Sequence, residues 1–387
     1  MNPVFENYEI PWMDDELSIL RDAAQKFFST QMQPHLDEWE ENGIVPLDAW
    51  RQAGAAGFLC AEVPAEYGGA GGTYLHESVI AEEQFRAGLA GWGNQVHSQI
   101  VAPYFVNYGS EEQKRAWLPK LAAGEAVGAI AMTEPNTGSD LQAVRTTAIK
   151  DGDDYIINGS KTYITNGQNC GVVIVVAKTD PDQGAKGISL LLVESDNPGF
   201  KRGRNLKKLG QASADTSELF FEDCRVPQSS LLGDEEGRGF IQLMQQLPQE
   251  RLTIAQGAVM EMERALAMTL DFVKERRAFG QRILDFQNTK FKLAECKTEA
   301  LIARTFVDQC VIQHINGKLD PATASMAKYW ATQKQCEIID ECLQLHGGAG
   351  YMDEYPISRM YKDARVQKIY GGTNEIMKEL ISRTLED

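Results

Sequence analysis

The hydrophobic periodicity of this 387-residue chain changes twice, and the two changes divide it into three zones. Residues 14–124 follow a helical pattern, residues 126–226 hold short β-rich runs separated by Gly, Asp and Asn, and the pattern is helical again from Gly237 onward. A chain of this length also exceeds what one hydrophobic core usually serves. The expected fold is α+β, with a helical domain at residues 1–125, a β domain at 126–232 and a second helical domain at 233–387.

Local signals place elements within these zones. Apolar residues between 17 and 28 recur at three- and four-residue spacing, which is typical of an amphipathic helix. Ser110 and Gln113 have the spacing of a capping box and predict the start of another helix. Residues 150–153 (KDGD) suit a hairpin turn. Pro248 predicts a kink or a restart in a helix. Long amphipathic helices are predicted over residues 257–277, 286–315 and 322–345.

The charge balance bears on possible partners. Lys plus Arg number 38 against 55 Asp plus Glu, which gives a formal net charge of −17. Such a surface repels nucleic acid and anionic lipid, so we expect no nucleic-acid partner. The longest apolar runs, residues 172–177 and 188–193, are far shorter than the ~20 residues that span a bilayer. We therefore expect no membrane span.

The N-terminal residues and the cysteines bear on the compartment. Residues 1–15 are polar and acidic, with neither the basic start nor the apolar core of a secretory signal. The seven cysteines are scattered and odd in number, as expected of free thiols in a reducing environment. We expect a cytoplasmic protein.

Some cofactor sites are not indicated. No stretch gives G-x-x-x-x-G-K-[ST], and neither glycine cluster completes G-x-G-x-x-G after a strand. The five histidines fall at no metal-ligand spacing, and Cys336 and Cys342 lie on different faces of a predicted helix. We therefore expect no metal site.

Two motifs of the β zone carry candidate binding chemistry. Residues 131–140 (AMTEPNTGSD) are interpreted as a strand running into a Pro/Gly loop rich in hydroxyls and backbone donors, which can hydrogen-bond a ligand. An ordinary turn with Glu134 as a surface charge is the alternative. Residues 159–167 (GSKTYITNG) are interpreted as a hairpin ending in an Asn-Gly turn, and they place the aromatic Tyr163 near the hydroxyl of Thr165.

Residues 274–280 (KERRAFG), in the C-terminal zone, admit two interpretations. Basic residues in a last helical turn followed by Gly280 make a good helix stop. The segment alone favours this helix stop over a binding role, although the guanidinium of Arg276 also suits bidentate binding of phosphate oxygens.

These motifs, together with residues 247–251 (LPQER) and 369–375 (IYGGTNE), resemble those of the acyl-CoA dehydrogenases over essentially the whole chain. The C-terminal half is most similar to the long-chain branch. The resemblance implies the acyl-CoA dehydrogenase fold with a C-terminal four-helix bundle, FAD as cofactor, and a homotetramer in which Arg276 reaches FAD across a subunit boundary. The FAD-contacting positions that it implies are Ile130, Ala131, Met132, Thr133, Ser139, Tyr163, Ile164, Thr165, Arg276, Phe279, Gln287, Gln344, Leu345, His346, Gly347, Gly348, Thr373, Asn374 and Glu375.

The same resemblance locates the catalytic base. Short- and medium-chain members carry a catalytic glutamate where this chain has Gly371, which offers no proton acceptor. Long-chain and isovaleryl-type members carry their base at the position of Glu250. The alternative is that Glu250 is an acidic residue in the first helical turn after Pro248, where the helix dipole favours it. We predict that Glu250 is the base and that the N–H of Gly371 donates to the thioester oxygen.

The implied reaction is α,β-dehydrogenation of a medium-to-long, straight or methyl-branched acyl-CoA to the trans-2-enoyl-CoA. Electrons would pass to electron-transferring flavoprotein. Residues 95–98 hold no arginine that could bind a distal carboxylate, which disfavours dicarboxylyl substrates. The substrate contacts that the resemblance implies are Ser139, Pro248, Gln249, Arg251, Gly371 and Gly372.

Other functions stay open. One is an isovaleryl-type dehydrogenase within the family. Another is an oxygen-using relative, either an acyl-CoA oxidase or a flavin monooxygenase, although typical acyl-CoA oxidases are longer and such monooxygenases need no base like Glu250. A third is a non-catalytic scaffold, which a colourless purified protein would indicate.

Overall fold

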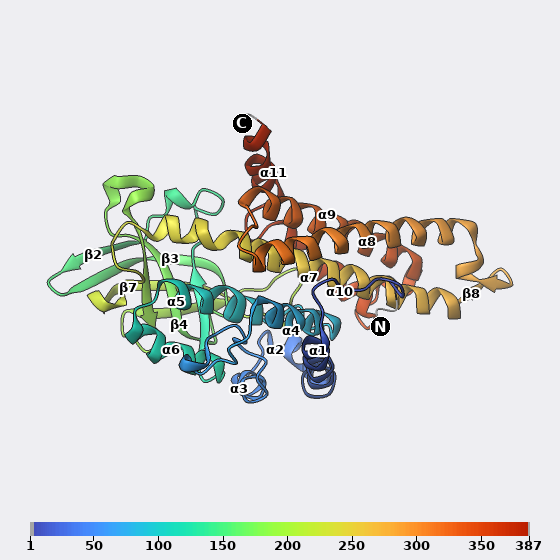
Figure 1. Ribbon diagram of the computed structural model, residues 1–387, viewed down its shortest axis with the longest axis horizontal. Coiled ribbons are helices and arrows are strands. Elements are labelled where there is room, and N and C mark those ends of the chain that lie inside the picture. The colour runs from blue at the N-terminus through green and yellow to red at the C-terminus, as the bar shows by residue number, and fades with distance from the viewer. Residues whose placement is uncertain (1–3, 386–387) are drawn as a thin grey trace.

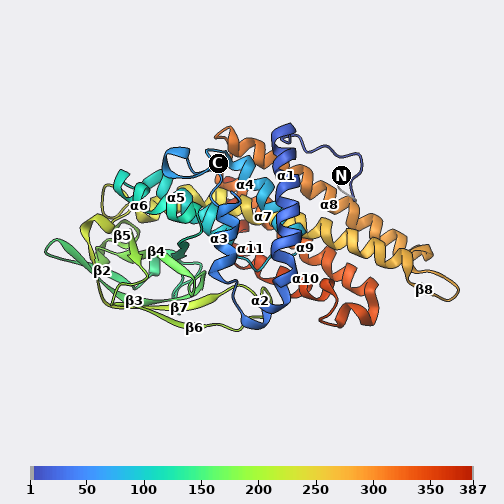
Figure 2. The same ribbon diagram turned by 90° about the horizontal axis from the view of Figure 1, so that it is seen from below.

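The computed structural model describes residues 4–385, in which helices, a sheet and a second set of helices follow one another along the chain. The sheet lies at one end of the molecule, the long C-terminal helices at the other, and the N-terminal helices pack along both (Figure 1). The view from below shows α1 crossing the middle of the molecule between these two ends (Figure 2). The predicted α+β fold is confirmed.

The N-terminal helices begin where the capping signals are. The side chain of Asp14 accepts a hydrogen bond from Leu17 N at 2.8 Å at the start of the first helix. Ser110 and Gln113 form both hydrogen bonds of the predicted capping box. Two π-helical segments, Phe28–Met32 and Gln95–Val101, extend the neighbouring helices. The helices are α1 (Asp15–Phe27), α2 (Leu36–Asn42), α3 (Leu47–Ala55), α4 (Tyr74–Arg86), α5 (Ala102–Tyr108) and α6 (Glu111–Ala122).

One mixed sheet forms the central zone, in the order β1-β4-β2-β3-β7-β6, with β5 paired to β4. The β2–β3 hairpin turns at the predicted site, where Gly152 has a φ of 63°. β1 and β4 are parallel, and β3 has register irregularities against β7 next to Lys161 and Ile164. The strands are β1 (Val127–Ala131), β2 (Thr147–Asp151), β3 (Asp154–Thr165), β4 (Cys170–Lys178), β5 (Ile188–Glu194), β6 (Phe200–Asn205) and β7 (Thr216–Pro227).

The C-terminal zone is dominated by three long helices, with α9 packed against both α7 and α8. A small β8–β9 hairpin joins α7 to α8 and projects from the end of the molecule (Figure 1). Two shorter helices, α10 and α11, were not predicted. The elements are α7 (Gly239–Glu275), β8 (Arg277–Ala278), β9 (Gln281–Arg282), α8 (Gln287–Ile315), α9 (Pro321–His346), α10 (Pro356–Ala364) and α11 (Asn374–Ser382).

The core consists of three hydrophobic clusters. Two of them lie on opposite faces of the sheet, and successive side chains of β4 point alternately into one and the other. Val172, Ile174 and Val176 face the N-terminal helices, whereas Val173 and Val175 face the other side of the sheet. The third cluster joins α1 and α4 to the C-terminal helices. Within residues 4–385 no helix is long and apolar enough to cross a membrane. The seven cysteines are free thiols.

Candidate active site

The helix that carries Glu250 differs from the prediction. α7 runs without interruption from Gly239 to Glu275 and contains Pro248 in its interior, so the helix does not restart there. Packing against α9 and α4 holds the helix through the proline, which overrides the local cost of the missing N–H. Glu250 therefore lies well inside a long helix, and attraction by a helix N-terminus does not explain an acidic residue at this position.

Glu250 is a buried carboxyl group, with 5% of its surface exposed. The phenol of Tyr104, on α5, donates a hydrogen bond to Glu250 Oε1 at 3.1 Å. Burial raises the pKa of Glu250 to about 7, although the hydrogen bond from Tyr104 and the positive charge of Arg251 both oppose the rise. A carboxyl group of this kind is poised to exchange a proton near neutral pH.

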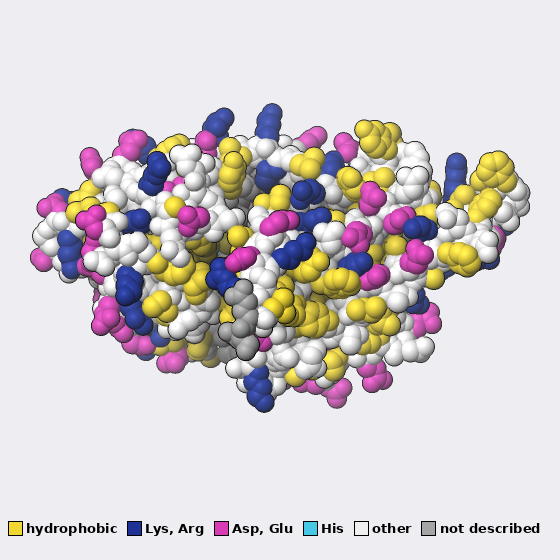
Figure 3. Space-filling view, turned by 90° about the horizontal axis from the view of Figure 1, so that it is seen from above, with side chains coloured by type: hydrophobic (Ala, Val, Ile, Leu, Met, Phe, Trp, Pro, Cys, Tyr) yellow, Lys and Arg dark blue, Asp and Glu magenta, His cyan; other side chains and the backbone are white. Residues whose placement is uncertain are grey.

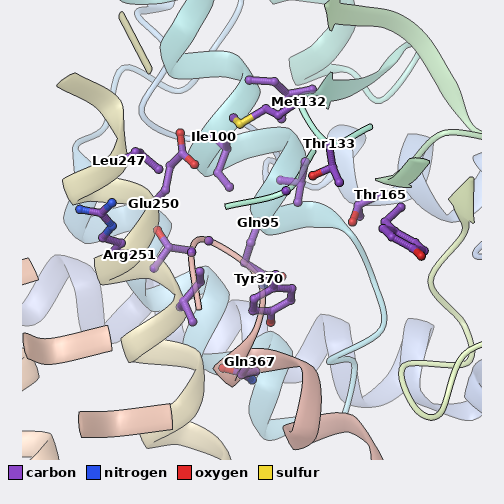
Figure 4. Close-up of a pocket in the computed structure, with 18 of the residues that line it drawn as sticks. Gln95, Ile100, Met132, Thr133, Thr165, Leu247, Glu250, Arg251, Gln367 and Tyr370 are labelled. Carbon is purple, nitrogen blue, oxygen red and sulfur yellow. The ribbon is translucent and has the colours of Figure 1, made fainter. Parts of the chain in front are cut away.

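A cavity of about 470 Å³ opens beside Glu250. It lies between α7 on one side and the loop that follows β1 together with the end of β3 on the other, and the turn before α11 closes a third side (Figure 4). Glu250 points toward Ile100, whereas the side chain of Arg251 extends in another direction (Figure 4). The predicted site residues that line this cavity are Ile130, Met132, Thr133, Ser139, Tyr163, Ile164, Thr165, Glu250, Arg251, Gly371 and Gly372.

The wall formed by the β zone is fixed by a buried ion pair. Lys161 Nζ donates to Glu134 Oε1 at 2.9 Å and to the backbone oxygen of Met132 at 3.1 Å. Glu134 also accepts hydrogen bonds from the backbone N–H groups of Arg145 and Thr146. Glu134 is thus not a surface charge, and the pair ties the 132–137 loop to β3.

Tyr163 stands out on this wall. Its backbone has a φ of 61°, a conformation that costs energy for a bulky residue and that often marks a functional site. Tyr163 as a whole residue is 69% exposed although it borders the cavity. The neighbouring hydroxyls of Thr133 and Thr165 also line the cavity (Figure 4). An exposed aromatic residue and two hydroxyl-bearing residues on one cavity wall fit a planar, polar-edged ring such as the isoalloxazine of FAD.

The Gly371–Gly372 turn closes the side of the cavity that faces Glu250. A Cβ at Gly371 would lie 2.3 Å from Ile254 Cδ1, and the φ of Gly371 is 63°. The N–H of Gly371 finds no acceptor within residues 4–385. Lys328, on α9, holds the turn by donating to Gly372 O at 2.7 Å. Glu250 and an unpaired backbone donor thus border the same cavity.

Several predicted contacts do not line the cavity. The side chain of Gln249 donates to the backbone oxygen of Gln99 at 3.1 Å, and Pro248 and Ala131 also lie outside the lining. Asn374 Oδ1 accepts from Lys328 and from Thr332, so this side chain is engaged within the protein. Thr373 caps α11, and Glu375 follows it in the first turn of that helix.

A second group of predicted FAD residues gathers at the far ends of α7 and α9, away from the cavity. Arg276 N donates to Phe272 O, and the ring of Phe272 stacks on His346 with 4.3 Å between centroids. Phe279, an aromatic residue of this group, is 95% exposed to solvent. Its members are Arg276, Phe279, Gln287, Gln344, Leu345, His346, Gly347 and Gly348.

Metal ligands do not gather in this structure. Within the described part of the chain, no group of three or more His, Cys, Asp or Glu side chains could hold a metal ion. His97, which is fully buried, lies 2.9 Å from Gly128 N and 3.0 Å from Leu121 O through its two ring nitrogens, so it is engaged in backbone contacts.

Comparison with known proteins gives the family. The N-terminal, middle and C-terminal domains of acyl-CoA dehydrogenases match residues 14–125, 129–224 and 237–386. The chain belongs to the acyl-CoA dehydrogenase family, whose members are FAD-dependent oxidoreductases. The predicted family, enzyme class and cofactor are confirmed.

Individual relatives cover nearly the whole chain. The mitochondrial long-chain specific acyl-CoA dehydrogenase of Sus scrofa is 52% identical over 372 residues, which are 96% of this chain and 86% of that protein. An acyl-CoA dehydrogenase structure from Geobacillus kaustophilus has a TM-score of 0.96 and 47% identity, covering 97% of this chain and all of that one. A glutaryl-CoA dehydrogenase structure from Mycobacterium smegmatis, in complex with FADH2, has a TM-score of 0.91 and 29% identity over 99% and 98% of the two chains.

Three residues of the site were not found from the sequence. Tyr104, Lys161 and Lys328 are fully buried polar residues that contact Glu250, the 132–137 loop and the Gly371–Gly372 turn respectively. Lys161 lies within the 159–167 motif. A Lys inside an otherwise apolar helix face is the signal that marks Lys328, whereas the local sequence does not mark Tyr104.

Proposed function

We propose that this protein oxidises medium-to-long acyl-CoA thioesters to trans-2-enoyl-CoA products, with Glu250 removing the α-proton. The proposal is carried by one observation: a buried carboxyl group and an unpaired backbone N–H, that of Gly371, border the same cavity. Such a pair supplies what a thioester needs, because a base takes the proton while a donor stabilises charge on the carbonyl oxygen.

The chemistry of the chain's own residues follows from this geometry. Glu250 accepts the α-proton, the electron pair left on the α-carbon forms the new double bond, and the β-hydrogen departs as hydride. The N–H of Gly371 stabilises negative charge on the thioester oxygen, and one such donor is typically worth about 2.7–4 kcal/mol. Bound FAD supplies the hydride acceptor. Because only the carboxylate form of Glu250 can act, the rate should rise with pH through about 7.

We place the FAD ring against Tyr163, Thr133 and Thr165. The uncovered ring of Tyr163 offers the stacking surface, and the two hydroxyls offer hydrogen bonds to the polar edge of the ring. The buried Lys161–Glu134 pair keeps this wall in one conformation before the cofactor arrives.

A second copy of the chain would complete the FAD site. The predicted FAD residues fall into two groups at different places on one chain, and most members of the group around Arg276 are solvent-exposed. Hydrophobic side chains also lie over the C-terminal helices and at the end that carries the β8–β9 hairpin (Figure 3). Uncovered apolar residues of α8 and α9 include Phe291, Ile302 and Met326. A homotetramer that covers these surfaces agrees with the family resemblance.

Replacing Arg276 by alanine is expected to loosen FAD and the assembly together, since its guanidinium would bridge a phosphate of FAD and a neighbouring subunit. Sedimentation velocity followed at the flavin absorbance measures both effects in one experiment. Arg277→Ala, at the adjacent exposed arginine, is the matched control and should retain FAD and the tetramer. A wild-type monomer that holds one tightly bound FAD would contradict the shared site.

The substrate preference follows from the cavity wall. Ile100, Phe240, Met244 and Leu247 give it an apolar side, and residues 95–98 provide no arginine for a distal carboxylate. Each buried methylene should contribute up to ~0.8 kcal/mol, so kcat/KM should climb with chain length until the cavity ends. Assays with a series of straight and methyl-branched acyl-CoAs test this. A maximum at butyryl- or glutaryl-CoA would exclude the assignment, and one at isovaleryl-CoA would move the protein to the neighbouring branch.

Electron-transferring flavoprotein is the acceptor that we propose, in keeping with the family resemblance. The competing function is that of an oxygen-using relative. Mixing the anaerobically reduced protein with air and, separately, with electron-transferring flavoprotein distinguishes the two, because an oxidase would be reoxidised promptly by air alone.

A further inference from the structure

Tyr104 occupies a place beside Glu250 that the reaction scheme above leaves unassigned. It lies on α5, 146 residues before Glu250 in the sequence, and its side chain is fully buried. Its Oη donates to Glu250 Oε1 at 3.1 Å, and Glu250 accepts no other hydrogen bond from residues 4–385. Tyr104 therefore fixes one oxygen of the carboxyl group.

The other oxygen of Glu250 is left open. Oε2 accepts no hydrogen bond from the described residues, yet it is not enclosed, and Glu250 lines the cavity. The tether on Oε1 thus turns Oε2 toward the space where the substrate would lie. Since a carboxylate in an apolar pocket can rotate freely without such a tether, the hydrogen bond sets the direction of the accepting oxygen.

The role of Tyr104 rests on the proposed function of Glu250 and goes beyond it. We infer that Tyr104 is a positioning residue, which holds the base in its proton-accepting orientation and tunes the pH at which the base acts. The phenol stays protonated, because burial and the nearby carboxylate raise the pKa of Tyr104 well above its usual range. A donor that cannot ionise favours the carboxylate over the acid form of Glu250.

The other charged and titratable groups near this part of α7 do not replace Tyr104. The guanidinium of Arg251 contacts Ser325 Oγ at 3.3 Å and favours the carboxylate only through its charge. Other groups in this region are bonded elsewhere: Tyr74 on α4 to Gln256, His97 to backbone atoms, Tyr108 on α5 to Gln245, Lys328 on α9 to Gly372 and Asn374, and Arg383 at the cavity rim to Glu379.

The test is the pH dependence of anaerobic flavin reduction in the FAD-loaded protein carrying Tyr104→Phe. Loss of the hydrogen bond should move the midpoint of the profile upward by about one to two pH units, which lowers the rate at pH 7 by about 5- to 50-fold. At high pH the rate should level off below that of the wild type, because the untethered carboxylate no longer holds its accepting oxygen toward the substrate. Tyr108→Phe removes the same atom one turn further along α5, and it should leave the midpoint in place.

Fluorotyrosines at position 104 give a second measurement that preserves the fold. A more acidic phenol is a stronger donor, so the midpoint should fall as fluorine is added, opposite to the effect of phenylalanine. An unchanged midpoint in both Tyr104→Phe and the fluorotyrosine proteins would overturn the inference while leaving Glu250 as the base. Full flavin reduction by Glu250→Gln would instead overturn the proposed function itself.

Discussion

Glutamine at position 250 is expected to slow flavin reduction by about 10²–10⁴-fold, the usual contribution of a general base, while acyl-CoA binding changes little. The amide has the shape of the carboxyl group, and its oxygen can still accept the hydrogen bond from Tyr104. What it lacks is the ability to take a proton. Stopped-flow absorbance of the flavin under anaerobic conditions measures the rate, and titration with a substrate analogue measures binding.

Glu261→Gln is the matched control for this substitution. Glu261 is another buried glutamate of α7, and burial raises its pKa to about 7 as well, but it lies outside the cavity. This variant should reduce its flavin at the wild-type rate. A Glu250→Gln protein that reduces its flavin as fast as the wild type would show that another group is the base. Moving the base to position 371 would require a left-handed backbone at the new side chain and displacement of Ile254.

Methionine in place of Lys161 is expected to destabilise the protein by about 3–5 kcal/mol, because it leaves a buried charge on Glu134 without its cation. Both side chains of the pair are nearly inaccessible, at 0% and 6% exposure. The 132–137 loop should loosen at the same time, so that FAD is retained less tightly. Chemical denaturation gives the free energy of unfolding, and the flavin absorbance after dialysis gives the cofactor content.

The double variant Glu134→Gln Lys161→Met separates the charge from the packing. It removes both charges of the pair and should recover most of the lost stability. The single variant should also lose less stability at low pH, because protonation of Glu134 removes the isolated charge. If Lys161→Met lowered the free energy of unfolding by less than about 1 kcal/mol, the pair would contribute no more than an exposed salt bridge does. That result would contradict its role in fixing the loop.

Much of the fold could be predicted because its signals are local. The cap at Ser110, the turn at residues 150–153 and the change from helical to strand periodicity each depend on a few neighbouring residues, and all three are present in the structure. The restart predicted at Pro248 was wrong because packing of α7 against other helices outweighs a local preference. The short helices α10 and α11 were missed although α10 does carry a periodic signal, since its buried residues Ile357, Met360 and Ala364 recur at three- and four-residue spacing.

The candidate site could be predicted only where its residues lie in contiguous motifs. The structure brings Thr133, Tyr163, Glu250 and Gly371 to one cavity, from four separate motifs. Tyr104 reaches Glu250 across 146 residues, and nothing in its local sequence separates it from an ordinary core tyrosine. Which residues of a second subunit would face the cavity cannot follow from the sequence of one chain, because it depends on how two surfaces meet.

Anaerobic titration of the purified protein with saturated acyl-CoAs of increasing length tests the central assignment most directly. The protein should be yellow, and medium-to-long acyl-CoAs should bleach its flavin in step with the appearance of trans-2-enoyl-CoA. A protein that binds no flavin, or one whose flavin stays oxidised with every acyl-CoA, would contradict the assignment.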